Sequence, residues 1–205
     1  MRMTTMFLGA LAAVALAGPA PAKKAEPAEA VVERLNEGLL GVMKQSEALD
    51  YGARYDRIEP LVEDTFDVAF MAEKSLGRHW HDLSAEDQTR WKDLFRRFMV
   101  ANYAGRFEGY SGQSFEKRGI EPGAYDTVMV RTTLVNPKDE NVDLNYRLRE
   151  TEAGWRVVDV YLRGTVSELA LRRSDYSAVM KRDGFEALAT YLSGKIDALA
   201  AGTPE

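Results

Sequence analysis

The chain contains no cysteine and only two histidines, His79 and His81, among its 205 residues. The missing thiols exclude disulfide-stapled miniproteins, thiol enzymes, iron–sulfur proteins and cysteine-ligated zinc modules. The two histidines stand two positions apart between predicted helices, and that spacing would turn their rings to opposite faces of a helix. We therefore expect surface histidines in a helix–helix loop, no metal site and no cofactor.

The sequence also lacks the signature motifs of several enzyme classes. It has no G-x-S-x-G nucleophile elbow, and neither G-x-G-x-x-G nor G-x-x-x-x-G-K-[ST] occurs. An excess of positive charge is missing as well, since 27 Lys and Arg stand against 32 Asp and Glu. The formal net charge of −5 disfavours nucleic acid as a partner, because nothing offsets the phosphate charges.

Only the amino terminus carries a long apolar run, at residues 7–17. The run follows a weakly basic start at Arg2 and precedes a small-residue Ala-Pro-Ala sequence that ends at Ala22. It is too short to span a bilayer and matches a secretory signal peptide with its cleavage site. The sequence thus predicts a signal peptide at residues 1–22 and a single exported domain at 23–205, with an N-terminal membrane anchor as the alternative.

The two ends of the exported chain show helical periodicity. The predicted helices cover residues 31–43, 49–58 (ending at Glu59-Pro60), 66–76 (followed by Gly77), a segment that starts after Ser84, 167–181 and 184–199. The helix after Ser84 is the clearest, because serine is a good N-cap and a broad apolar and aromatic stripe follows it. The stripe consists of Trp91, Leu94, Phe95, Phe98, Met99, Tyr103 and Phe107.

The middle of the chain alternates with a period of two, which is typical of strands. The predicted strands cover residues 113–121, 128–135, 142–149 and 155–160, and turns separate them. In the last strand, either Val158 or Val160 continues the face of Trp155 and Val157. Helices, then an antiparallel meander, then helices indicate an α+β domain.

The aromatic stripe faces a sheet surface that holds Val128, Val130, Tyr146, Leu148 and Val160. One interpretation is an ordinary filled core. The other is that helix and sheet stand apart around a cavity, which the flexible side chains of Met99, Met129 and Met180 would line well. Periodicity does not distinguish a filled core from a hollow one, so both interpretations stay open at this point.

Asp159 interrupts an otherwise apolar strand. A functional interpretation makes it a general base in a cavity. A structural one places it on the solvent face or pairs it with an arginine such as Arg163, Arg172 or Arg173, and the pattern favours this second interpretation. The adjacent Arg172 and Arg173 could bind an anionic headgroup or phosphate, although such pairs more commonly form an ion-paired helix face.

An ordered series of short motifs runs along nearly the whole exported chain. They are Phe66-Asp67, Leu76-Gly77-Arg78, Leu83-Ser84, Asn102-Tyr103, Val130-Arg131-Thr132, Asn145-Tyr146-Arg147-Leu148, Gly154-Trp155-Arg156-Val157-Val158-Asp159-Val160, Gly164-Thr165-Val166-Ser167 and Arg173-Ser174-Asp175-Tyr176. In this order they resemble the MlaC family, also called the toluene-tolerance (Ttg2-type) family. No single motif is specific, and the resemblance rests on the ordered set.

The resemblance implies a lipid carrier in the periplasm of a Gram-negative bacterium. It implies a curved antiparallel sheet, here of about four strands, packed against a helical layer around an apolar cavity for lipid. Residues 164–176, preceded by Arg163 where the family usually has an acid, resemble the hopanoid-associated HpnM branch. The implied ligand is therefore a hopanoid or a phospholipid, and Asp159 takes a structural role.

The resemblance also implies protein partners. They are an inner-membrane lipid transporter of RND or MCE/ABC type and a possible outer-membrane acceptor.

The expected lipid-binding residues are Phe70, Trp91, Phe95, Phe98, Met99, Tyr103, Val128, Val130, Tyr146, Leu148, Val160 and Val166. We expect no catalytic residue and no enzyme. The alternatives are a cone-shaped α+β isomerase or dehydratase that uses Asp159, and an exported adaptor with a filled core that binds only protein.

The histidine spacing and the missing cysteines predict a protein that is stable without metal. A chelator should leave the melting temperature unchanged, because no side-chain set is expected to hold a structural ion. A fall of more than a few degrees that added zinc reverses would contradict this prediction.

Overall fold

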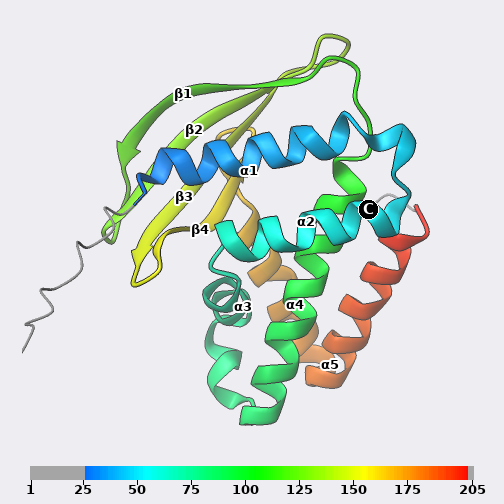
Figure 1. Cartoon of the computed structure of the whole chain (residues 1–205). Coiled ribbons are helices and arrows are strands. Elements are labelled where there is room, and N and C mark those ends of the chain that lie inside the picture. Colours follow the sequence, from blue (N-terminus) through cyan, green and yellow to red (C-terminus); the bar gives the residue numbers. More distant parts are fainter. Residues whose placement is uncertain (1–25, 203–205) are drawn as a thin grey trace, which may run out of the picture.

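The computed structural model describes residues 26–202, so the predicted signal peptide at residues 1–22 lies outside the described residues. The chain forms a helical layer and a curved sheet (Figure 1). With η for a 3₁₀ helix, its elements are α1 (Ala28–Met43), η1 (Ser46–Ala48), α2 (Tyr51–Thr65), α3 (Val68–Leu76), η2 (Gly77–Asp82), α4 (Ala85–Arg106), β1 (Ser114–Pro122), β2 (Thr127–Val135), β3 (Val142–Thr151), β4 (Gly154–Leu162), β5 (Val166–Ser167) and α5 (Glu168–Ala200). The predicted α+β class is confirmed.

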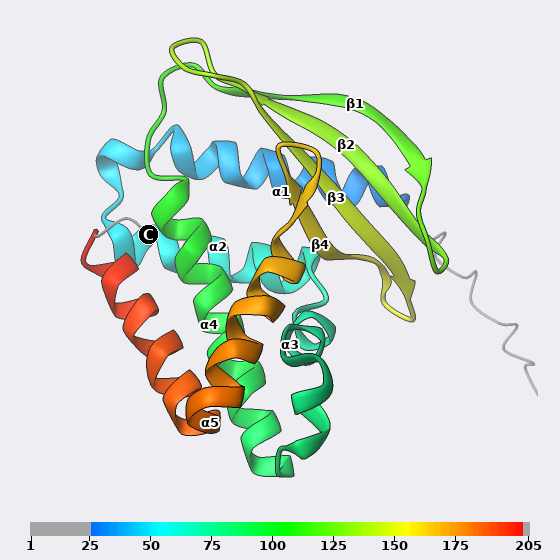
Figure 2. The same ribbon diagram turned by 180° about the vertical axis from the view of Figure 1, so that it is seen from behind.

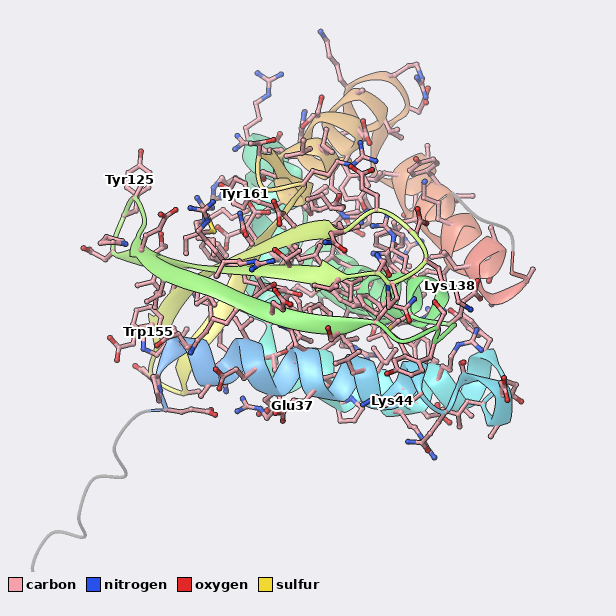
Figure 3. The ribbon with its side chains drawn as sticks, turned by 90° about the horizontal axis from the view of Figure 1, so that it is seen from above. Glu37, Lys44, Tyr125, Lys138, Trp155 and Tyr161 are labelled. Carbon is pink, nitrogen blue, oxygen red and sulfur yellow. The ribbon has the colours of Figure 1, made fainter. Side chains whose placement is uncertain are left out.

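The five-stranded sheet is an antiparallel meander in the order β1-β2-β3-β4-β5. The sequence predicts about four strands, and the additional β5 has only two residues. Helix α1 runs along the sheet, and α3, α4 and α5 extend away from it on the side of β4 (Figures 1 and 2). The β1–β2 turn at Tyr125 and the β2–β3 turn at Lys138 lie at opposite ends of the sheet (Figure 3).

The strand register builds the inner face of the sheet. Tyr146 of β3 pairs with Val130 of β2 and with Val160 of β4, so the three buried side chains form one row. A bulge where β3 meets β4 then shifts the register. Because of this shift, Val157 and Val160 both reach the core although they are three positions apart. The sequence does not decide whether Val158 or Val160 joins Val157 on the inner face of β4. The structure shows that it is Val160, because of the bulge.

Local signals set several helix ends as the sequence predicts. Ser84 Oγ accepts a hydrogen bond of 3.1 Å from the Asp87 backbone N–H at the start of α4. Gly77 ends α3 with a φ of +57°, a backbone conformation that residues other than glycine rarely adopt. Helix α5 is interrupted at Gly184, where φ is +80°, which agrees with the two predicted C-terminal helices.

Two helix boundaries differ from the prediction. Helix α2 does not end before Pro60 but continues to its last residue, Thr65. Pro60 is exposed, so its missing N–H weakens only the solvent side, while the buried Ile58 and Val62 hold the helix on either side of it. Phe66 is extended rather than helical, because its backbone bridges to Val157 of β4 and so joins the chain to the sheet.

Asp159 lies at the junction of β4 with α5 and is only 2% exposed. Its carboxylate accepts hydrogen bonds from the backbone N–H of Val160 at 2.9 Å, from Ser167 Oγ at 2.6 Å and from the Leu169 N–H at 3.1 Å. The guanidinium of Arg147 lies 3.9 Å away. The carboxylate therefore caps the first turn of α5 from within the sheet.

The prediction that Asp159 faces solvent is wrong. The prediction that it lies beside an arginine is confirmed, but that arginine is Arg147 and none of the three that the sequence suggested. Arg172 forms its ion pair with Glu168 at 3.2 Å, which agrees with the expectation that the Arg172-Arg173 pair lies on an ion-paired helix face. The Arg173 guanidinium lies against Gly77, and Arg163 is exposed in the turn before β5. The sequence misses the true partners because they are mostly backbone groups, which carry no residue-type signal.

Burial raises the pKa of Asp159 above its ordinary value of 3.8, and the bonds from Ser167 and Leu169 only partly oppose this. At pH values between the ordinary and the raised pKa, the folded protein therefore keeps a proton that the unfolded chain has lost. The contribution of Asp159 to the free energy of unfolding is then largest at low pH and falls as the pH rises through the raised pKa.

Asp159→Asn removes this titration. In urea denaturation, the free energy of unfolding of the wild type minus that of the variant should decrease as the pH rises from about 4 and then become constant. A difference that increases with pH over this range would contradict the assignment.

Gly77 offers a test of the α3–η2 junction. A Cβ there would lie 2.6 Å from Arg173 Nε, and φ is already positive, so Gly77→Ala should lower the free energy of unfolding by about 1–3 kcal/mol. The control is Gly41→Ala in α1, where no atom lies within 4 Å of the added Cβ. That change should raise the free energy of unfolding by up to about 1 kcal/mol, and effects of the same sign would refute the account.

Candidate functional site

A cavity of about 290 Å³ lies between helix α4, the first turn of α5 and the inner face of the sheet. We call it the main cavity. Its lining residues are Met43, Phe66, Met71, Phe95, Met99, Asn102, Tyr103, Arg106, Phe107, Gly109, Gln113, Leu134, Asn136, Val142, Leu144, Tyr146, Val160, Leu162, Glu168, Leu169 and Arg172. Asn136 directly precedes the β2–β3 turn, so the cavity reaches the end of the sheet that Lys138 marks in Figure 3.

The aromatic stripe of α4 divides between two environments. At its first end, Trp91 is 0% exposed, donates from Nε1 to the Ala72 carbonyl at 3.0 Å and packs edge-on against Tyr176. Further along, Met99 and Phe107 line the main cavity instead. The filled-core interpretation therefore holds for the first turns of α4, and the cavity interpretation holds for the last turns.

Part of the predicted site set lines the main cavity: Phe95, Met99, Tyr103, Tyr146 and Val160. The others do not: Phe70, Trp91, Phe98, Val128, Val130, Leu148 and Val166. Met129 and Met180, which the cavity interpretation suggested, lie outside it as well.

The expected lipid-binding residues that do not line the main cavity are held elsewhere by other contacts. Phe98 is fully buried under the Arg172 guanidinium, whose carbon lies 4.6 Å from the ring centroid. Phe70 packs in the same way under Arg149, at 4.2 Å. Trp91 and Leu148 belong to the packed core, and Val128 is partly buried against it. Val130 lines a second cavity instead, whereas Val166 is exposed on the short β5.

Sequence reasoning missed several lining residues. Leu134, Val142 and Leu144 continue the alternation of their strands, so extending the expected sheet surface toward the β2–β3 turn would have found them. Met43 and Phe66 come from elements distant in the sequence, and no pattern in the sequence indicates them.

Charged residues line only part of the cavity. Arg172 and Glu168 form an ion pair of 3.2 Å at the first turn of α5. Arg106 lies at the end of α4 and is exposed, so we call this end of the cavity its mouth. Burial raises the pKa of Tyr103 and of Tyr146 above the ordinary value of 10.0, so both phenols stay neutral at physiological pH. The walls that α4 and the sheet form before the mouth are therefore uncharged.

A second cavity of about 200 Å³ lies between α1 and strands β1 and β2. Val32 and Val130 are part of its lining, and so are Lys117 and Glu33, which form an ion pair of 3.1 Å. Asn36 also lines this cavity, and its Oδ1 accepts a hydrogen bond of 3.1 Å from the Tyr146 hydroxyl. Since Tyr146 lines the main cavity, this hydrogen bond links the walls of the two cavities.

Over residues 26–202, no three or more His, Asp or Glu side chains are grouped so that they could hold a metal ion. Within the same part of the chain, no helix combines the length and the apolar character that crossing a membrane requires. The two histidines lie in η2, where His81 is exposed and His79 Nδ1 is 3.8 Å from Asp82.

Comparison with known proteins agrees with this geometry. No curated protein sequence matches the chain significantly. The structure is similar to that of a phospholipid-binding protein from Ralstonia solanacearum in complex with a phospholipid, with a TM-score of 0.74, 23% sequence identity and coverage of 85% of this chain and 99% of that chain. This likeness shows a shared fold. The model of the MlaC protein family matches residues 33–194, from α1 into α5, and the chain therefore belongs to the MlaC family.

Proposed function

We propose that this protein is a periplasmic lipid carrier, not an enzyme, and that it holds a phospholipid or a hopanoid in the main cavity. The observation that carries the proposal is the lining of the cavity, which is neutral and largely apolar along α4 and the sheet but charged at the exposed end of α4 and at the first turn of α5, as an amphiphile requires. The similar protein from Ralstonia solanacearum, a phospholipid-binding protein in complex with a phospholipid, supports the ligand class.

The energetics fit a carrier that must hold lipid in water. Each buried CH₂ group contributes about 0.8 kcal/mol, so a chain of 16 carbons gains of order 10 kcal/mol over exposure to solvent. At about 290 Å³, the main cavity lies at the lower end of the range of small-molecule pockets. We propose that Phe95, Met99 and Tyr103 on α4 and Tyr146 and Val160 on the sheet contact the chain.

The proposal includes movement between membranes. The carrier would exchange lipid with an inner-membrane transporter of RND or MCE/ABC type and with an outer-membrane acceptor. The resemblance of the 164–176 segment to the hopanoid-associated branch is the reason for keeping a hopanoid beside a phospholipid as the cargo.

The enzyme alternative has less support. Asp159 is outside the lining of the main cavity, and both of its oxygens accept hydrogen bonds that build the β4–α5 junction. A general base needs to reach the proton that it removes, and this carboxylate faces the start of a helix instead.

Adjacent residues of α4 provide the test of this function. Met99 is 6% exposed and lines the main cavity, so Met99→Trp fills space that the lipid chain needs. We expect the variant to retain a melting temperature close to that of the wild type but to take up much less lipid from vesicles. The measurements are thermal melting of the mature protein and mass spectrometry of the lipid bound after incubation.

Phe98→Trp is the matched control, because Phe98 lies one position earlier in filled core. Overpacking there should cost about 1–3 kcal/mol, or roughly 2–12 °C of melting temperature, with lipid uptake preserved. If Met99→Trp lowers the melting temperature like Phe98→Trp and leaves lipid uptake unchanged, the main cavity is not the lipid site.

A further inference from the structure

One face of α4 runs through the main cavity and changes its chemistry turn by turn. Phe95, Met99, Asn102 and Arg106 all line the cavity, in this order. With a rise of 1.5 Å per residue, Asn102 stands about 4.5 Å beyond Met99 and about 6 Å before Arg106 along the helix axis. The wall thus passes from aromatic and thioether groups to a neutral amide and then to a cation at the exposed end.

The amide of Asn102 has no partner in the fold. The residue is only 8% exposed, its Oδ1 is enclosed without a hydrogen bond, and its side chain bonds to no residue of the described chain. Other buried amides are engaged: Asn36 accepts from Tyr146, and Asn145 Nδ2 contacts the Gly164 carbonyl at 3.5 Å. Unpartnered polar groups in protein interiors are rare because they are costly.

We propose that Asn102 is the polar anchor of the main cavity. Its Oδ1 is enclosed, but its Nδ2 is not among the enclosed atoms, so Nδ2 is the group of this amide that can reach a ligand, and it donates to the ester carbonyl of an acyl glycerolipid. This inference rests on the proposed carrier function. In such a lipid the apolar chain is followed first by a neutral ester and then by a charged headgroup, which is the order of the groups on α4. The ester then lies at the level of Asn102, the chain beside Met99 and Phe95, and the headgroup at the mouth.

The anchor predicts selection for ester over ether linkages, since an ether oxygen is a much weaker acceptor than a carbonyl. The test uses mature protein stripped of lipid and vesicles that contain equal amounts of dipalmitoyl phosphatidylcholine and its dihexadecyl ether analogue. These lipids share headgroup and chain length. Mass spectrometry of the bound lipid should show about a fivefold excess of the ester in the wild type, as expected for one neutral hydrogen bond.

Asn102→Leu keeps the side-chain size and removes the donor. The variant should still take up lipid, with an ester-to-ether ratio near one, and its lipid-free form should melt no lower than the wild type because an unpartnered amide has been removed. The control is Gln113→Leu, another lining position, whose Oε1 already accepts from the Ser111 N–H. This variant should keep the ester preference.

Three outcomes would overturn the anchor. They are a ratio near one in the wild type, an ester preference that survives in Asn102→Leu, and a ratio that Gln113→Leu lowers as much as Asn102→Leu does. If Asn102→Leu fails to fold, the wild-type ratio and Asn102→Ala decide the question. Wild-type protein that takes up neither lipid would refute the carrier function itself, which is a different result from uptake without selection.

Discussion

The buried carboxylate of Asp159 joins the sheet to the helical layer, and the main cavity depends on this junction. It accepts from β4 at Val160, from β5 at Ser167 and from the first turn of α5 at Leu169. That same first turn supplies Leu169, together with the Glu168–Arg172 pair, to the cavity wall. Asp159 therefore stands in an apolar strand because its carboxylate fixes the start of α5 against the sheet. Burying this acid costs desolvation free energy.

The cavity exists because α4 is packed tightly at one end only. Around Trp91, side chains from α3 and α5 fill the space beside the helix, and the indole N–H is bonded to the Ala72 carbonyl. Toward Met99 and Tyr103 the helix faces the sheet row of Tyr146 and Val160, and this space is not filled. The packed end fixes the position of the helix relative to α3 and α5.

The sequence predicts which residues share one face of a helix or strand better than it predicts what that face packs against. The α4 stripe, the strand alternation and the caps at Ser84 and Gly77 follow from local chemistry, and the structure bears them out. The register bulge between β3 and β4, which brings Val157 and Val160 to the same side, has no signal in the composition. Asn102 belongs to one of the motifs behind the family resemblance, but it is absent from the expected lipid-binding residues because that set was chosen by apolar periodicity, which passes over an amide.

Whether lipid occupies the main cavity is decided by organic extraction of the purified wild-type protein, followed by mass spectrometry of the extract. We expect a glycerolipid or hopanoid, present in an amount comparable to that of the protein. A folded, monodisperse protein whose extract contains no lipid, and that acquires none from vesicles, would contradict this expectation.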